Sequence, residues 1–294
     1  MSTLASVVRA SRPISWINTA FPFAAGYLMA TREVDAVLIV GTLFFLIPYN
    51  LLMYGINDVF DYESDLANPR KGGIEGDVIL DRERARGVHR AILWASAVTV
   101  LPPFVWLVLQ GTVAAGLTLA LVVFGVIAYS APGLRFKERP FLDSLTSALH
   151  FCGPLIYALV IAGASLTSRS VWPVWGAFIL WGMASHAFGA VQDVRADREG
   201  GIGSVATVIG ARATVWFALA LYGASSLLLL ALPWPGTLAA VLPLAYLVSV
   251  ARFVGVTDAT CEEANRGWRT FLWLNQPVGF LVTLLLIAVW NGWL

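Results

Sequence analysis

Acidic and amide side chains gather in two short stretches of this chain, and the first occupies residues 57–65, at the end of an apolar run. With about 100° of rotation per helical residue, Asn57, Asp58, Asp61 and Asp65 fall within one arc of about 100°, whereas Glu63 faces away. Carboxylates crowded on one helical face repel one another and need a compensating cation. Oxygen-only ligand sets select hard ions, so this stretch predicts a Mg²⁺ site.

A solvated helix end is the alternative interpretation, because carboxylates at helix ends are common. Two observations favour a site instead. Acids at the C-terminal end of a helix oppose the helix dipole, and a second acidic stretch follows downstream. There Asp193 and Asp197 are four residues apart and stack on one helical face. His186 falls on the same face two turns deeper, although a buried histidine is more often a satisfied hydrogen-bonding group than a catalyst.

Cations follow the acidic stretches in the neighbouring loops. Arg70 and Lys71 lie in a glycine-rich segment whose proline ends the helix and turns the chain back over the acids. Arg135 and Lys137 are one residue apart in a later loop that begins after Tyr129. They are interpreted either as the ordinary positive charge of a cytoplasmic loop or as a clamp for an anion beside the acids.

The elements that must position these residues are apolar. Hydrophobic residues make up 58% of the 294 and charged residues 13%, and the mean hydropathy is +0.75. A soluble domain has roughly 25% charged residues, so this composition excludes a soluble domain. It indicates a polytopic membrane protein. The net charge of +1 predicts no nucleic-acid partner. Apolar runs of membrane length cover residues 13–30, 37–62, 91–109, 113–130, 142–165, 171–193, 212–232, 237–254 and 270–290.

We therefore expect an all-α integral membrane protein in which residues 1–294 form a single domain of nine transmembrane helices. Cytoplasmic loops collect Lys and Arg, and all 19 of these residues except Arg32 and Arg169 fall on one side of the nine runs. This asymmetry predicts a cytoplasmic N-terminus, an external C-terminus and acidic stretches that open to the cytoplasm. Residues 200–204 echo residues 72–76, which suggests an internal duplication of helices 1–4 and 5–8.

Two carboxylate clusters beside Lys and Arg are what a Mg²⁺-bridged diphosphate requires. Because the site opens into an apolar bundle, the organic part of the substrate should be a lipid tail, which indicates a prenyl diphosphate. An ion-coupled transporter also carries carboxylates within the membrane. A transporter should place them near the bilayer midplane on broken helices, whereas these lie at helix ends beside cations.

The pattern Asn57-Asp58-x-x-Asp61-x-x-x-Asp65, the pair Asp193-x-x-x-Asp197, and Tyr129 with Arg135 and Lys137 closely resemble the UbiA superfamily of intramembrane prenyltransferases. The resemblance spans the whole chain. It implies that two Mg²⁺ ions are held on a prenyl diphosphate by Asp58, Asp61, Asp65, Asp193 and Asp197, aided by Asn57. It also implies a diphosphate site made by Asn57, Arg70, Lys71, Tyr129, Arg135 and Lys137. The allylic C–O bond would then ionise, and the π-electrons of an acceptor would capture the carbocation.

Residues 68–76 differ from the Arg-rich pattern that is usual in members acting on aromatic acceptors, and they look like the lycopene elongases. This resemblance implies dimethylallyl diphosphate as donor and lycopene, drawn from the bilayer, as acceptor, with C45 and C50 carotenoids as products. Another member of the superfamily, making a quinone, chlorophyll or haem lipid, stays open as an alternative. The sequence offers no general base, and it leaves open whether the acceptor cation loses a proton or adds water.

Overall fold

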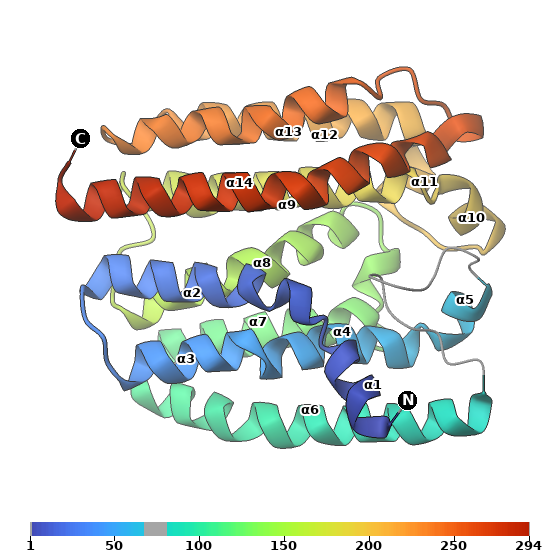
Figure 1. The fold of residues 1–294 in the computed structure, drawn as a ribbon, viewed down its shortest axis with the longest axis horizontal. Coiled ribbons are helices and arrows are strands. Elements are labelled where there is room, and N and C mark those ends of the chain that lie inside the picture. Colours follow the sequence, from blue (N-terminus) through green and yellow to red (C-terminus); the bar gives the residue numbers. More distant parts are fainter. Residues whose placement is uncertain (1, 68–80, 294) are drawn as a thin grey trace. The chain divides into compact units, whose positions relative to one another are not determined.

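The computed structural model describes residues 2–67 and 81–293, and the regular elements in these two ranges are all helices (Figure 1). The chain forms two compact units. The first unit comprises Met1–Phe136 and His150–Ala164, and the second comprises Lys137–Leu149 and Ser165–Leu294. The single domain and the internal duplication expected from the sequence stay predictions.

In the first unit, α2 packs on α3, and α4 packs on both α6 and α7. A short helix, α1, contacts α4 and α6 near the N-terminus (Figure 1). The elements of this unit are α1 (Thr3–Ala10), η1 (Pro13–Ser15), α2 (Trp16–Thr31), α3 (Ala36–Leu46), α4 (Pro48–Phe60), α5 (Tyr62–Ala67), α6 (Arg82–Gln110), α7 (Val113–Ser130) and the larger part of α8 (Leu142–Ile161).

In the second unit, α12 packs against α9 and α13, and α14 packs against the same two helices. Two short helices, α10 and α11, connect α9 to α12 (Figure 1). The elements of this unit are α9 (Trp172–Val191), α10 (Val194–Glu199), α11 (Val205–Ile209), α12 (Ala211–Leu229), η4 (Gly236–Val241), α13 (Leu242–Ala251), η5 (Asp258–Glu263) and α14 (Ala264–Asn291). The turn η3 (Phe136–Glu138) precedes α8.

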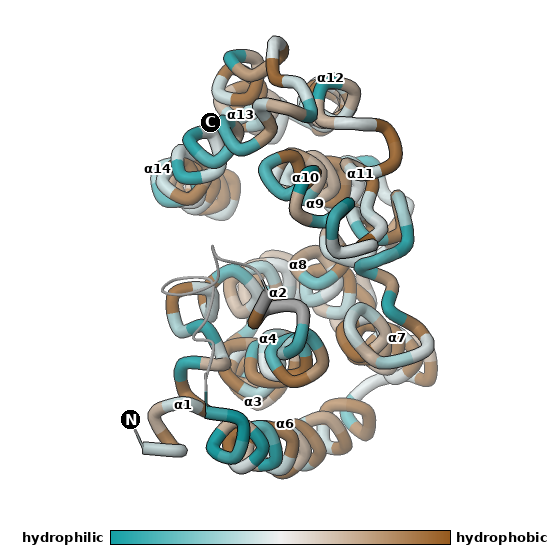
Figure 2. The backbone as a smooth tube through the Cα atoms, turned by 90° about the vertical axis from the view of Figure 1, so that its right-hand side faces the viewer, coloured by the Kyte–Doolittle hydropathy of each residue, from teal (hydrophilic) through white to brown (hydrophobic). Residues whose placement is uncertain are grey.

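Within the described part of the chain, seven helical stretches are long and apolar enough to cross a membrane. They are Ala36–Phe60, Arg82–Gln110, Val113–Ser130, Leu142–Ile161, Trp172–Val191, Ala211–Leu229 and Asp258–Asn291. Figure 2 shows hydrophilic residues at α10 and at the start of α6, whereas the long helices are mainly hydrophobic. The two other predicted runs are also helical, but their helices are shorter than the 18 residues that the seven long stretches reach or exceed. Helix α2 has 16 residues, and Gly236–Ala251 is a shorter apolar stretch. The protein is a multi-pass membrane protein.

The continuous helix expected over residues 37–62 is interrupted. Helix α3 ends at Leu46 and α4 begins at Pro48, because proline has no N–H to donate and its ring clashes with the preceding turn. The buried Asn50 side chain donates hydrogen bonds to the carbonyl oxygens of Phe45 (2.8 Å) and Leu46 (3.1 Å), next to the interruption. It also donates to the hydroxyl of Thr19 on α2, at 2.6 Å, and so ties the break to a neighbouring helix.

Aromatic side chains fill the interior of each unit. In the first unit the buried Phe23 ring lies 5.1 Å from Phe45 and 5.9 Å from Tyr157, centroid to centroid. In the second unit Tyr222 stacks on Tyr246 at 5.7 Å. Aromatic pairs at such separations contribute about 0.5–1.5 kcal/mol beyond the area they bury. Because lipid tails are as apolar as the side chains, this close packing is what holds membrane helices together.

Helices α8 and α9 lie close together at a glycine of the second unit, Gly182. A Cβ added at Gly182 would lie 2.8 Å from Cβ and 3.0 Å from Cα of Ala148. Real side chains do not tolerate such overlap with a backbone atom, so only glycine fits this crossing. Gly279 of α14, by contrast, has no atom within 4 Å of its would-be Cβ.

We predict that Gly182→Ala lowers the free energy of unfolding by about 2 kcal/mol, the usual cost of overpacking a core. Gly279→Ala should be neutral or stabilising by up to about 1 kcal/mol, because alanine favours the helix more than glycine does. Thermal unfolding of the detergent-purified variants measures both effects. Equal unfolding temperatures for the two variants would contradict the close crossing of α8 and α9.

Candidate active site

The first acidic stretch lies where α4 ends, in the first unit. Helix α4 stops at Phe60, Asp61 caps its C-terminus, and a separate helix, α5, begins at Tyr62. The sequence predicted one continuous helix that carries Asn57 to Asp65 on one arc, and this prediction is wrong beyond Phe60. The backbone of Asp61, with φ −99° and ψ 0°, still donates its N–H to the Asn57 carbonyl at 2.9 Å, and the helix ends there. The side chain of Asp65 lies outside the described part of the structure, as do Arg70 and Lys71 entirely.

Asp58 forms a bidentate ion pair with Arg12. The two guanidinium nitrogens donate to the two carboxylate oxygens, at 2.6 and 3.1 Å. The Arg12 side chain is only 10% exposed, and its guanidinium lies 5.6 Å from the centre of the Tyr54 ring. Paired geometry of this kind is the strongest that arginine makes with a carboxylate.

Arg12 is a site residue that the sequence analysis missed. It follows α1 with φ 50°, in the left-handed region that costs a non-glycine residue of order 1–3 kcal/mol and persists only where the surroundings hold it. In the sequence it counted only toward the positive charge of the N-terminus. An arginine before the proline that opens η1 was the signal available, but nothing in the sequence linked it to an acid 46 residues away.

Asp61 is almost fully buried, at 3% exposure, and one of its carboxylate oxygens lies 3.5 Å from a guanidinium nitrogen of Arg135. Nearby, the Ser130 hydroxyl donates to the side-chain oxygen of Asn57 at 2.8 Å. The structure thus brings three predicted residues, Asn57, Asp61 and Arg135, to one end of the first unit. Tyr129, at the end of α7, packs edge-on against His150, with ring centres 4.9 Å apart.

The second acidic pair lies between α9 and α10 in the second unit. Helix α9 ends at Val191, and Asp193 is the residue before α10, so the continuous helix expected from His186 to Asp197 is wrong. The two acids stay in register, since the Asp197 N–H donates to the Asp193 carbonyl at 2.8 Å. Both are half-buried. Lys137, also half-buried, belongs to this unit.

The basic residues of α10 are engaged with acids of η5. Arg195 pairs with Glu262, and Arg198 pairs with Asp258 at 2.5 Å. These arginines therefore hold α10 against η5. Lys137, and neither of these arginines, is the residue of the second unit that the sequence predicted to bind diphosphate.

A second residue missed by the sequence analysis is Asp143, near the start of α8. Its carboxylate is fully buried and accepts the backbone N–H of Val205 at 2.8 Å and the Ser144 hydroxyl at 3.2 Å. The imidazole Nε2 of His186 lies 3.7 Å away. The carboxylate therefore ties α8, α9 and α11 together below the acidic pair. A single acid at the start of an apolar run was the only sequence signal for this role.

Comparison with known proteins places this geometry in a family. The model of the UbiA prenyltransferase family matches residues 19–275. The chain belongs to the UbiA prenyltransferase family. It is 60% identical, over 98% of its length, to the C(50) beta-cyclic carotenoids biosynthesis protein LbtBC of a Dietzia strain, and it spans 66% of that longer protein. It is 51% identical to a lycopene elongase/hydratase of Corynebacterium glutamicum, over 98% of this chain and 99% of that protein.

Solved UbiA structures share the fold. A UbiA homologue from Archaeoglobus fulgidus, bound to DMAPP and Mg²⁺, aligns over 93% of this chain and 98% of that one, with a TM-score of 0.64 at 18% identity. A digeranylgeranylglyceryl phosphate synthase aligns over 96% and 97%, with a TM-score of 0.62 at 16% identity. The family membership makes this protein a prenyltransferase.

The UbiA resemblance implies Mg²⁺, and the donor chemistry of this chain suits that ion. In the first unit, Asn57, Asp58 and Asp61 carry amide and carboxylate oxygens at the C-terminal end of α4. In the second unit, Asp193 and Asp197 carry two more carboxylates. Hard oxygen donors of this kind prefer Mg²⁺ to softer metals. Among residues 2–67 and 81–293, however, no three His, Cys, Asp or Glu side chains form a group that could hold a metal by itself.

We predict that Arg12→Gln destabilises this prenyltransferase by about 3 kcal/mol, because it leaves the Asp58 carboxylate without its bidentate partner. Arg82→Gln is the matched control. Arg82 also makes a two-nitrogen ion pair, with Glu63, but both side chains are more than 60% exposed. Exposed pairs contribute at most about 1 kcal/mol.

Thermal unfolding in detergent with a metal chelator measures both variants in the same state. If Arg82→Gln lowers the unfolding temperature as much as Arg12→Gln does, the Arg12–Asp58 pair does not stabilise the protein more than an exposed ion pair.

Proposed function

We propose that this prenyltransferase transfers the C5 group of dimethylallyl diphosphate to the two ends of lycopene, giving C45 and then C50 carotenoids. The observation that carries the proposal is the 51% identity to the Corynebacterium lycopene elongase/hydratase, which extends over nearly the whole of both chains. The 60% identity to the Dietzia protein of C50 carotenoid biosynthesis supports the same acceptor class. Residues 68–76, on which the sequence analysis based this assignment, lie outside the described residues.

The carboxylates of the two acidic stretches are proposed, from the family resemblance, to act on one diphosphate. Bound Mg²⁺, two ions in this proposal, would neutralise the diphosphate and favour its departure. The family resemblance and the hard oxygen donors support this assignment, as does the Archaeoglobus homologue solved with DMAPP and Mg²⁺. The proposed metal-binding residues are Asn57, Asp58, Asp61, Asp65, Asp193 and Asp197.

Cations of this chain are proposed to hold the diphosphate oxygens. When the allylic C–O bond breaks, negative charge moves onto the leaving diphosphate, and a donor fixed in advance beside it stabilises that charge. Arg135 fits this role, since its guanidinium is already placed 3.5 Å from the Asp61 carboxylate. The other proposed diphosphate-binding residues are Asn57, Arg70, Lys71, Tyr129 and Lys137.

The interior of the second unit suits a hydrocarbon acceptor better than a phenol. Two of its buried hydroxyls already have partners: Ser185 donates to the Trp181 carbonyl at 2.7 Å, and Ser225 donates to the Ala177 carbonyl at 2.8 Å. A phenol or an aromatic acid without a partner would cost about 1–3 kcal/mol on burial. The terminal double bond of a polyene needs no partner to attack the allylic cation.

The site is proposed to open to the cytoplasm in a protein that spans the cell membrane nine times. The seven long spans, together with α2 and the shorter helical stretch Gly236–Ala251, make up the nine crossings. All Lys and Arg residues except Arg32 and Arg169 then lie on one side, as the positive-inside tendency requires.

Reporter fusions test this topology. A reporter that is active only outside the cytoplasm should give signal when it is fused to Leu294 and none when it is fused after Gly76. The opposite pattern would overturn the orientation and, with it, the cytoplasmic placement of the acidic clusters.

Asp61→Asn and Asp193→Asn should each lower turnover by at least about 100-fold, since losing one charged ligand removes about 2.7 kcal/mol or more of transition-state stabilisation. Glu63→Gln should be nearly silent, because Glu63 is exposed and pairs with Arg82. Release of diphosphate by purified protein, assayed with added Mg²⁺ and with a chelator, measures both. Full activity in the chelator, or equal losses at Glu63 and Asp61, would count against the metal assignment.

Expression in a lycopene-making host tests the acceptor. The pigment mass should rise by one and then two C5 units, with or without one water per end, and the Asp61→Asn variant should leave lycopene unchanged. If the wild-type membranes leave lycopene unchanged but prenylate a quinone, chlorophyll or haem precursor, the acceptor is wrong and the prenyltransferase assignment still holds.

A further inference from the structure

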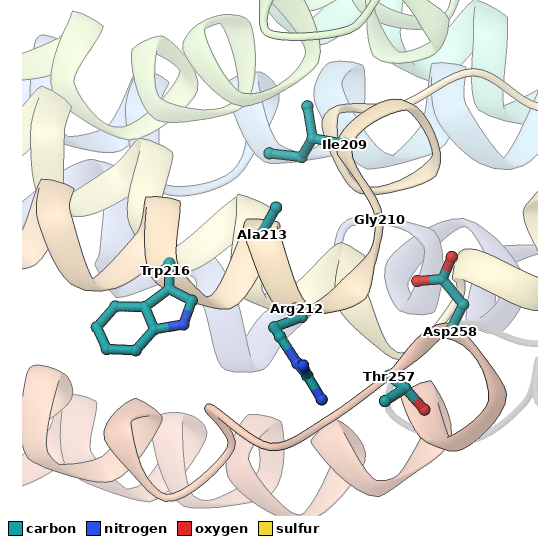
Figure 3. A pocket seen from close by; sticks show the side chains of 7 residues that line it. All are labelled: Ile209, Gly210, Arg212, Ala213, Trp216, Thr257 and Asp258. Carbon is teal, nitrogen blue, oxygen red and sulfur yellow. The ribbon is translucent and has the colours of Figure 1, made fainter.

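A pocket of about 530 Å³ opens in the second unit where α12 begins (Figure 3). Ile209, Arg212, Ala213 and Trp216 line one side, and Thr257 and Asp258, from the segment leading into η5, line the other. Its volume is in the range of small-molecule sites, about 300–1,000 Å³. None of its lining residues belongs to the predicted prenyltransferase site, so the reaction proposed above assigns no role to this pocket.

The charges around the pocket leave a positive site. The two oxygens of Asp258 are both engaged, one accepting the backbone N–H of Ala211 at 2.7 Å and the other the Arg198 guanidinium at 2.5 Å. Arg212 is exposed, and it makes no hydrogen bond or ion pair with any residue in the described ranges. Its side chain points toward the segment that carries Thr257 (Figure 3). The Arg212 guanidinium, with five N–H donors, therefore lines the pocket without an acceptor among the described residues. The Thr257 hydroxyl beside it lies 3.3 Å from the Thr260 hydroxyl.

The pocket lies at the end of a helix that is long and apolar enough to cross a membrane. Helix α12 is one of the seven spans and begins at Ala211, so Arg212 is in its first turn. Trp216 is one turn deeper on the same face, and its indole is 57% exposed. Tryptophan is enriched at the level of lipid headgroups, and basic pockets between membrane helices bind acidic headgroups. Ile209 and Ala213 add apolar walls beside the arginine.

We infer that this pocket binds the headgroup of an anionic phospholipid of the surrounding bilayer. The Arg212 guanidinium donates two parallel hydrogen bonds to the phosphate oxygens, the Thr257 hydroxyl donates a third, and Trp216 packs against the glycerol and upper acyl carbons. A soluble phosphate could use only the polar half of this pocket. An anionic lipid uses both halves, and its negative charge complements Arg212, the basic residue among those that line the pocket.

Native mass spectrometry of the detergent-purified protein, titrated with phosphatidylglycerol or phosphatidylcholine, tests the inference. The wild type should retain phosphatidylglycerol at least about 10-fold more tightly than phosphatidylcholine. Arg212→Gln should lose one bound phosphatidylglycerol, and Arg212→Lys should weaken it because lysine lacks the bidentate geometry. Arg252→Gln is the matched control: Arg252 is exposed, lies outside the pocket and likewise makes no contact of this kind with the described residues.

Three outcomes would overturn the inference: equal retention of the two lipids, loss of the bound lipid in Arg252→Gln as well, or no change in Arg212→Gln. Inorganic phosphate, added at the same concentration as the lipid, forms a further arm. If it displaces the bound phosphatidylglycerol completely, the pocket is a site for soluble anions and the lipid assignment fails.

Discussion

A carboxylate at the end of an apolar helix is stable only when a cation or water compensates its charge, and this constraint governs the first unit. A charged side chain costs about 2.5–3.5 kcal/mol at a bilayer centre. Asp58 and Asp61 lie at the end of α4, and arginines from two other segments reach them: Arg12 from the turn after α1, and Arg135 from the loop after α7.

Both arginines hold left-handed backbone conformations, with φ 50° at Arg12 and φ 39° at Arg135. Such conformations cost a non-glycine residue of order 1–3 kcal/mol each and persist where surrounding contacts determine them. The ion pairs with the two aspartates offset this cost. The acidic end of the first unit is therefore held together by contacts within that unit, the Arg12–Asp58 and Arg135–Asp61 pairs.

The composition and the apolar runs predicted the membrane fold well, because a span needs only length and apolarity. They could not predict the interruptions. A rotation of about 100° per residue assumes an unbroken helix. In the structure the helices are interrupted before Pro48, at Asp61 and after Val191. At Pro48 the cause was visible in the sequence, but the Asn50 contacts that stabilise the break depend on α2.

The candidate site was found from the acids, which are rare in an apolar chain and therefore informative. Their partners were harder to predict. Arg12 and Asp143 act across sequence separations of 46 and 62 residues, and only the packing of helices brings these groups together. Arg135 was predicted as a diphosphate-binding residue because, with Tyr129 and Lys137, it belongs to the pattern that resembles the family. Arg12 was not, because basic residues near a membrane protein's N-terminus are expected for topology alone.

The most direct test of the account is to count metal ions on a bound diphosphate. Mn²⁺ can stand in for Mg²⁺ and be observed by electron paramagnetic resonance, with a dimethylallyl diphosphate analogue that cannot ionise. We expect two bound Mn²⁺ ions with coupling to phosphorus in the wild type and in Glu63→Gln, and loss of bound metal in both Asp61→Asn and Asp193→Asn. Unchanged metal binding and phosphorus coupling in either aspartate variant would contradict the proposal that Asp61 and Asp193 both bind metal on the diphosphate.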